Sequence, residues 1–113
     1  MPIPHPIPDP LVELIARRFR AIGEPMRIRI LDRLRDGEAP VTDLAEAVGA
    51  SQQNLSKHLA VLAEVGIVGR RRDGTRIYYR IVDESVLGLC EEVCGSVQRQ
   101  VSDLGNILEG VGR

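Results

Sequence analysis

Residues 51–82 read SQQNLSKHLAVLAEVGIVGRRRDGTRIYYRIV, and this stretch decides the fold. Its first part predicts a helix, because apolar residues recur three or four positions apart from Leu55 to Val65. Ser51 is a suitable N-cap, since its hydroxyl can accept a hydrogen bond from a first-turn amide. Gly66 suits the left-handed position at which a helix ends. The sequence therefore predicts an amphipathic helix between Ser51 and Gly66.

The other face of this helix consists of hydrogen-bonding side chains, most of them in the first two turns. The N-terminal part of a recognition helix is the part that meets base edges in the major groove of DNA. The same polar face would also suit a helix that is merely solvated, and His58 suits a local hydrogen bond as well as a DNA contact. The candidate base-contacting residues are Ser51, Gln52, Gln53, Asn54, Ser56, Lys57 and His58.

The second part of the stretch predicts a β-hairpin that carries five arginines. Asp73-Gly74 is a strong signal for a tight hairpin turn, and the residues from Arg76 to Ile81 include β-branched and aromatic side chains that favour a strand. Arginine presents planar, forked donors that fit phosphate oxygens, although charged edge strands also protect a sheet from aggregation. We expect four of these arginines to hold the DNA backbone: Arg70, Arg71, Arg72 and Arg76.

Charge is distributed unevenly along the 113 residues, whose net charge is only −1. Residues 66–82 have a charge balance of +4, whereas residues 83–113 have a balance of −4. Such asymmetry indicates one side of the molecule that faces DNA and another that faces away from it. The length fits one domain, and three aromatic residues without tryptophan predict an aliphatic core.

The rest of the chain predicts a mainly α-helical winged helix-turn-helix with a small β-hairpin wing. Residues 1–8 alternate proline with other residues and should form an extended, mobile arm, whereas residues 9–110 should form the DNA-binding and dimerisation domain. Only Gly49-Ala50-Ser51 separates the third helix from the fourth, which is the tight connection of a helix-turn-helix. The other expected helices run from Asp9 (N-cap) to Gly23, from Pro25 to Gly37, from Thr42 (N-cap) to Gly49, and from Asp83 to Glu109.

The first and last of these helices carry more apolar surface than one small core can bury. Pairing them with copies across a two-fold axis would cover both, and two-fold dimers are the commonest oligomers. The symmetry would also present two recognition helices to half-sites about one helical turn, ~34 Å, apart. The apolar or small residues of the last helix recur at gaps of three or four, at Val86, Cys90, Val93, Val97, Val101, Leu104 and Leu108.

The order of these elements and several sequence blocks resemble the ArsR/SmtB family of bacterial repressors. The resemblance covers residues 11–82, and it extends to the last helix by position and amphipathicity only. It implies a homodimer that binds operator DNA and releases it when an inducer binds, which in most relatives is a metal ion or a thiol-reactive agent. The matching blocks are GEPMRIRIL (23–31), VTDLA (41–45), LSKHL (55–59), LAEVGIV (62–68) and RRDGTRIYY (71–79).

The inducer sites that the resemblance implies are not intact in this chain. The third helix of relatives carries a Cys-x-Cys element, where this chain has Asp43–Ala47 without a thiol. The last helix of relatives carries Asp and His ligands, but the last helix here contains no histidine. Persulfide-sensing relatives pair a cysteine of the second helix with one of the last, and residues 25–35 contain none.

Two cysteines on the last helix remain as candidate inducer ligands. Cys90 and Cys94 are four residues apart, so their sulfur atoms lie on neighbouring parts of one helix face. Two thiolates supply half of a tetrahedral zinc site, or two donors for nickel. Further ligands would come from His5 in the arm, from Glu91 or Asp83, or from a second subunit. Both cysteines also suit plain apolar packing or redox sensing. A regulator without its own site would take its signal from a co-regulator protein.

Other functions and locations fit the sequence less well. The chain lacks a Gly-rich phosphate loop, a Gly-x-Ser-x-Gly motif and a His-Glu-x-x-His motif, so we do not expect an enzyme. A winged helix that binds another protein instead of DNA is the remaining alternative. No apolar run approaches the ~18 residues of a membrane span, and MPIPHPIPDP does not resemble a secretory signal. We therefore expect no membrane partner, a cytoplasmic location and reduced thiols.

Overall fold

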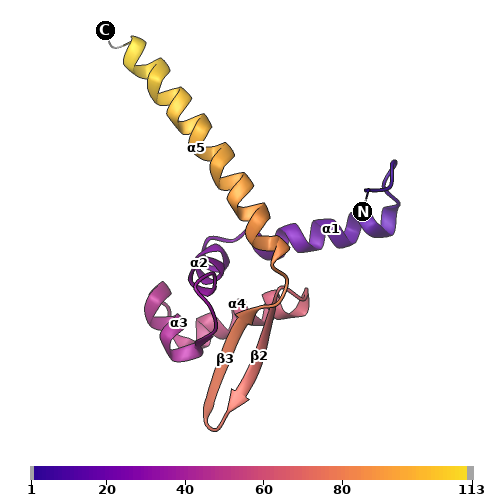
Figure 1. Ribbon diagram of the computed structural model, residues 1–113, viewed down its shortest axis with the longest axis vertical. Coiled ribbons are helices and arrows are strands. Elements are labelled where there is room, and N and C mark those ends of the chain that lie inside the picture. The colour runs from indigo at the N-terminus through magenta and orange to yellow at the C-terminus, as the bar shows by residue number, and fades with distance from the viewer. Residues whose placement is uncertain (1, 112–113) are drawn as a thin grey trace. The chain divides into compact units, whose positions relative to one another are not determined.

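The computed structural model describes the backbone of residues 2–111 and the side chains of residues 2–106 (Figure 1). Contacts divide the chain into two units, Met1–Asp83 and Glu84–Arg113. The first unit contains α1 (Asp9–Ile22), α2 (Pro25–Leu34), β1 (Ala39–Pro40), α3 (Val41–Val48), α4 (Gln52–Glu64), β2 (Val68–Asp73) and β3 (Arg76–Ile81). The second unit contains α5 (Ser85–Val111).

The predicted recognition helix is confirmed as α4, with both of its predicted ends. The Ser51 hydroxyl oxygen accepts a hydrogen bond of 3.1 Å from the backbone N–H of Asn54, which satisfies a first-turn donor. Gly66 follows the helix with a φ of 78°, the left-handed conformation that favours glycine. The three inward leucines of α4 are completely buried, at Leu55, Leu59 and Leu62.

Two predicted helix starts are wrong, that of α1 by one position and that of α3 by two. α1 begins at Asp9 itself and α3 begins at Val41, so neither Asp9 nor Thr42 is an N-cap. Pro8 and Pro40 occupy the cap positions, with ψ values of 144° and 154° and no side-chain hydrogen bond to the helix. A proline ring fixes φ at a value that this extended position accepts. Proline therefore starts both helices where we expected a hydrogen-bonding cap.

The sheet has three antiparallel strands in the order β1-β3-β2, one more than the predicted hairpin. The hairpin turns at Asp73-Gly74 as predicted, and Gly74 has a φ of 63°. The additional strand, β1, is only two residues long and pairs with β3. It follows α2, which ends at Leu34 and not at the predicted Gly37. A two-residue strand that contains proline has no alternating pattern, so the sequence carries no signal for it.

The register of the wing, which is the hairpin β2–β3, separates its arginines into two sets. Arg70 lies opposite Tyr79 and Arg72 opposite Ile77, whereas Arg71 lies opposite Tyr78. Successive side chains of a strand point to opposite faces of the sheet. Arg70 and Arg72 therefore share one face of the wing, and Arg71 occupies the other.

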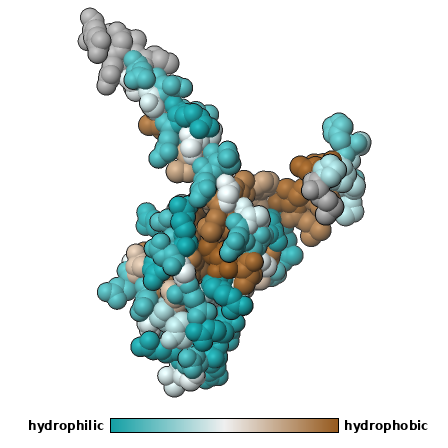
Figure 2. Space-filling model, viewed as in Figure 1, coloured by the Kyte–Doolittle hydropathy of each residue, from teal (hydrophilic) through white to brown (hydrophobic). Residues whose placement is uncertain are grey.

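An aliphatic core holds α2, α3, α4 and the base of the wing together, as the composition predicts. Its fully buried large side chains are Ile30, Leu31, Leu44, Leu55, Leu59, Leu62 and Ile67. The helix-turn-helix of α3 and α4 followed by the β2–β3 wing confirms the predicted winged helix-turn-helix. By contrast, Leu14 and Phe19 of α1 are 61% and 54% exposed, and Figure 2 shows hydrophobic residues along this helix.

The second unit presents an exposed apolar stripe along α5. Val93, Val97, Val101 and Leu104 are each at least half exposed within one chain, and their spacing of four, four and three places them on one face of the helix. Leu108, which the sequence assigns to the same stripe, lies outside the residues whose side chains the structure describes. No helix in the described part of the chain is long and apolar enough to cross a membrane.

Candidate nucleic-acid interface

The polar face of α4 is presented to solvent as one continuous surface. The Ser51 cap and the first two turns of α4 place six of the seven candidate residues in exposed positions, namely Ser51, Gln52, Gln53, Asn54, Ser56 and Lys57. The N-terminus of a helix also carries unpaired N–H groups and the positive end of the helix dipole, which favour anions. This end of α4 therefore combines exposed hydrogen-bonding side chains with an attraction for anions.

A groove of about 600 Å³ runs between α4 and the wing within the first unit. One wall is the α4 face that carries Gln52 and Ser56, and the other is the wing face that carries Arg70. The start of α3 closes one end through Thr42, and Thr75 of the wing tip also lines the groove. The sequence analysis missed both threonines as interface candidates, because their position depends on how α3 and the wing pack around α4.

The arginines of the wing differ in their surroundings. Arg70 lines the groove, and the Arg72 Nε donates a hydrogen bond of 3.2 Å to the carbonyl oxygen of Gly74. Arg76 also lines the groove, and its hydrogen bond with Tyr78 raises its pKa above the ordinary arginine value. All three remain exposed cations. By the strand register, Arg70 and Arg72 share one face of the wing, whereas Arg76 lies on the face of Tyr78 near the wing tip.

Arg71 differs from the other wing arginines, because its exposed side chain forms an ion pair with Glu38 on the protein surface. Its Nε lies 2.9 Å from both carboxylate oxygens of Glu38, and its Nη2 lies 2.6 Å from Oε1 of the same residue. The guanidinium also lies over the Tyr78 ring, 4.4 Å from the ring centroid. The hydrogen bond from Arg71 lowers the pKa of Glu38, and Glu38 raises the pKa of Arg71. Both groups are therefore held in their charged forms.

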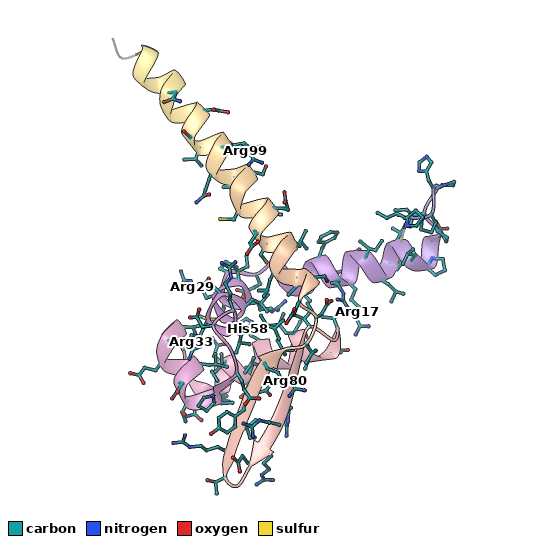
Figure 3. All side chains as sticks on the ribbon, in the orientation of Figure 1. Arg17, Arg29, Arg33, His58, Arg80 and Arg99 are labelled. Atoms are coloured by element: carbon teal, nitrogen blue, oxygen red, sulfur yellow. The ribbon has the colours of Figure 1, made fainter. Side chains whose placement is uncertain are left out.

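His58, which is labelled in Figure 3, does not line the groove, and it takes part in a local hydrogen bond. Its side chain is only 17% exposed, and its Nδ1 accepts a hydrogen bond of 3.2 Å from the Nε of Arg27. Arg27 in turn donates to the carbonyl oxygens of Arg20 and Ala21 at the end of α1. The structure thus favours the local role for His58, as a link between α4 and the α1–α2 corner. Its separation of 31 residues from Arg27 explains why no sequence pattern indicates this pairing.

The candidate metal ligands are divided between the two units of the chain. Cys90 is half-buried and Cys94 is exposed on α5, and His5 is exposed in the segment before α1. Among the residues that the structure describes, no group of three or more His, Cys, Asp or Glu side chains is placed to hold a metal ion. Two thiolates are only half of the four ligands of a structural zinc site.

Comparisons with known proteins agree with the arrangement of a helix-turn-helix followed by a wing. A helix-turn-helix domain model matches residues 22–71, from the end of α1 to the first half of the wing. The transcriptional regulator KmtR of Mycobacterium tuberculosis is 42% identical over 83 residues, which are 74% of this chain. The chain spans 64% of the length of KmtR.

Solved structures are similar over the whole winged helix. One is a homodimeric winged helix-turn-helix DNA-binding domain from Mycobacterium bovis, named as a possible ArsR-family regulator. It has a TM-score of 0.73 and 36% identity, with coverage of 80% of this chain and 84% of that one. Another is the antimony-specific repressor AntR, with a TM-score of 0.70, 35% identity, and coverage of 81% and 83%. The sequence blocks, the fold and these similarities together show that the chain belongs to the ArsR/SmtB family of winged helix-turn-helix transcriptional regulators.

Proposed function

We propose that this protein is a sequence-specific, dimeric DNA-binding repressor that places α4 in the major groove and the wing against the flanking backbone. The observation that carries the proposal is the exposed row of hydrogen-bonding side chains at the start of α4, beside a groove lined by Arg70 and Arg76. Glutamine can pair with adenine and lysine with guanine in the major groove, which gives Gln52, Gln53 and Lys57 the role of readers. Phosphate contacts from the wing add affinity and set the register without reading sequence.

The proposed binding unit is a homodimer joined through α1 and α5. The similar Mycobacterium bovis domain is homodimeric, and both helices of this chain have exposed apolar residues, such as Phe19 of α1 and Val97 of α5. Burial of such residues against a second copy removes apolar surface from water, which is the main driving force of association. A two-fold dimer suits an operator with two related half-sites.

Salt dependence tests the proposal against a winged helix that binds only protein. Binding of the wild-type chain to a labelled random-sequence duplex should weaken by orders of magnitude between roughly 50 and 200 mM salt, because each phosphate contact releases counterions. Fluorescence anisotropy over a salt series measures this slope. A chain without measurable affinity for any duplex at the lowest salt would overturn the DNA-binding proposal.

Two substitutions should separate backbone contacts from base reading. Arg70→Gln should weaken binding to all duplexes alike and reduce the salt slope by about 0.9, the value of one phosphate contact. Gln53→Ala should instead reduce discrimination at particular base pairs, each worth about 1–3 kcal/mol, with little change in the salt slope. Binding to a randomised duplex library, followed by sequencing, measures both effects. Equal losses of affinity on every sequence for Gln53→Ala would contradict its proposed contact with base edges in the major groove.

For the inducer, we propose that Cys90 and Cys94 supply thiolates to a nickel or zinc site that a second chain or His5 has to complete. A relative that is an antimony-specific repressor supports a metal or metalloid inducer. The competing proposal is a regulator that takes its signal from a partner protein, and the missing third ligand within one described chain favours it.

Metal titration distinguishes the two inducer proposals. Nickel added to the reduced protein should produce a thiolate-to-metal absorption band, because sulfur ligands of nickel are deprotonated on binding. Cys94→Ser should abolish the band, and Ser96→Ala, two residues further along α5, should leave it intact. If the wild-type protein gives no such band with nickel or with cobalt, the cysteines are not ligands and the partner-protein proposal stands.

A further inference from the structure

Glu38, a residue outside the predicted interface, is connected to the wing across the full width of the sheet. It immediately precedes β1, whose Pro40 lies opposite Tyr78 of the central strand β3. Tyr78 lies opposite Arg71 on β2. The side chains of Glu38 and Arg71 meet over this central residue, with the guanidinium stacked on the Tyr78 ring. One ion pair therefore joins the residue before β1, at one edge of the sheet, to β2 at the other edge.

The geometry of this pair is the one that arginine uses for a DNA phosphate. Arg71 presents Nε and Nη2 together to the two oxygens of one carboxylate, at 2.6 to 2.9 Å. Forked arginine contacts to phosphate use the same two parallel donors. The remaining nitrogen, Nη1, lies 3.9 Å from Asp73 Oδ2. Glu38 therefore already occupies the Nε–Nη2 edge of Arg71, one of the two edges through which a guanidinium holds a phosphate.

We propose that Glu38 is a positioning residue that holds Arg71 in place of a DNA phosphate, so that the wing binds DNA through Arg70, Arg72 and Arg76 and keeps Arg71 for its own structure. This inference rests on the proposed DNA-binding function. It has two consequences for DNA binding. The wing is fixed to the body of the domain at Glu38, and one of its five arginines adds no counterion release. Affinity for non-specific DNA is consequently lower than the number of arginines suggests.

Both members of the pair are charged at neutral pH. The hydrogen bond from Arg71 lowers the pKa of Glu38, and the nearby positive charge of Arg80 contributes in the same direction. A carboxyl group with a lowered pKa is ionised at neutral pH. Asp73 also faces Arg71, but at a longer distance and with a 72% exposed side chain. Glu38 is thus the dominant partner of Arg71.

Salt-dependent binding to a random-sequence duplex tests the inference, with each variant compared with the wild type. Glu38→Gln removes the negative charge that holds Arg71, so the freed guanidinium should gain one phosphate contact and steepen the salt slope by about 0.9. In the Arg71→Gln background, Glu38→Gln should leave the slope unchanged, because no guanidinium is left to release. Asp73→Asn is the matched control. Like Glu38→Gln, it removes one negative charge near Arg71, and it retains a favoured Asn-Gly turn. It should leave the slope near the wild-type value.

The outcomes separate this inference from the proposed function. A wild-type chain that binds DNA, with equal slopes for Glu38→Gln and the wild type, would overturn the role of Glu38 while DNA binding stands. Equal steepening by Glu38→Gln and Asp73→Asn would also overturn it, because general electrostatics would then explain the change. Should Glu38→Gln disturb the wing, Arg71→Gln alone decides: it should lower the slope by much less than Arg70→Gln, and an equal reduction would refute the inference.

Discussion

Leu59→Ala is expected to destabilise the DNA-binding unit by about 2–5 kcal/mol, the range for removing a large buried aliphatic side chain. Leu59 is completely buried, as are its α4 neighbours Leu55 and Leu62. Its truncation removes apolar contacts and leaves a cavity that the surrounding helices fill only in part. Because domains of this kind are stable by only about 5–15 kcal/mol, such a loss is a large share of the total.

Urea denaturation at a fixed protein concentration measures this loss, since the stability of a dimer depends on concentration. Lys57→Ala is the matched control on the same helix. Its side chain is exposed, so its stability should stay within about 0.5 kcal/mol of the wild type while its affinity for DNA falls. A loss below about 1 kcal/mol for Leu59→Ala would contradict the packing of α4 described above.

The features that the sequence predicts correctly are those with local signals. Ser51 caps α4, Gly66 ends it, and Asp73-Gly74 turns the hairpin, in each case because the decisive contact lies within a few residues. The leucines of α4 repeat with the helical period, so their burial also follows from the sequence. These local signals predict the helix and hairpin of the winged helix-turn-helix, whereas the family follows from the resemblance of the sequence blocks.

The features that the sequence does not predict depend on contacts between distant residues. Glu38 and Arg71 are 33 positions apart, and Arg27 and His58 are 31 apart. Each pair meets only because β1 joins the sheet, or because α2 packs beside α4. The sequence therefore groups Arg71 and His58 with the other DNA-binding candidates, although each has a hydrogen-bond partner elsewhere in the protein. A charged residue in a basic cluster is not necessarily available to a ligand.

The same limit applies to the candidate metal ligands. The spacing of Cys90 and Cys94 places two sulfur atoms near each other on one helix, which the sequence alone can predict. A complete metal site needs further ligands from other segments, and the described residues of one chain do not bring three such side chains together. The spacing on one helix therefore indicates two candidate thiolates but not the rest of a metal site.

Val97→Glu is expected to convert the protein into a monomer and to reduce operator affinity by about 10²–10⁴-fold. Val97 lies in the middle of the exposed α5 stripe formed with Val93, Val101 and Leu104. In the proposed dimer this stripe is buried against a second copy, where an unpaired carboxylate is costly. A loss of about 2–4 kcal/mol at such a central position raises the dimer dissociation constant roughly 30- to 700-fold. The operator then loses the gain in affinity that comes from linking two binding modules.

Sedimentation at micromolar concentration measures the assembly, and anisotropy with a two-half-site duplex measures the affinity. Gln98→Glu adds the same charge at the next residue of α5, whose exposed side chain points away from Val97, so this variant should remain dimeric. If Val97→Glu remains a dimer, the α5 stripe is not the interface. If it becomes a monomer with undiminished operator affinity, each chain reads DNA by itself. Only the joint loss of assembly and affinity fits two α4 helices that one dimer presents to one duplex.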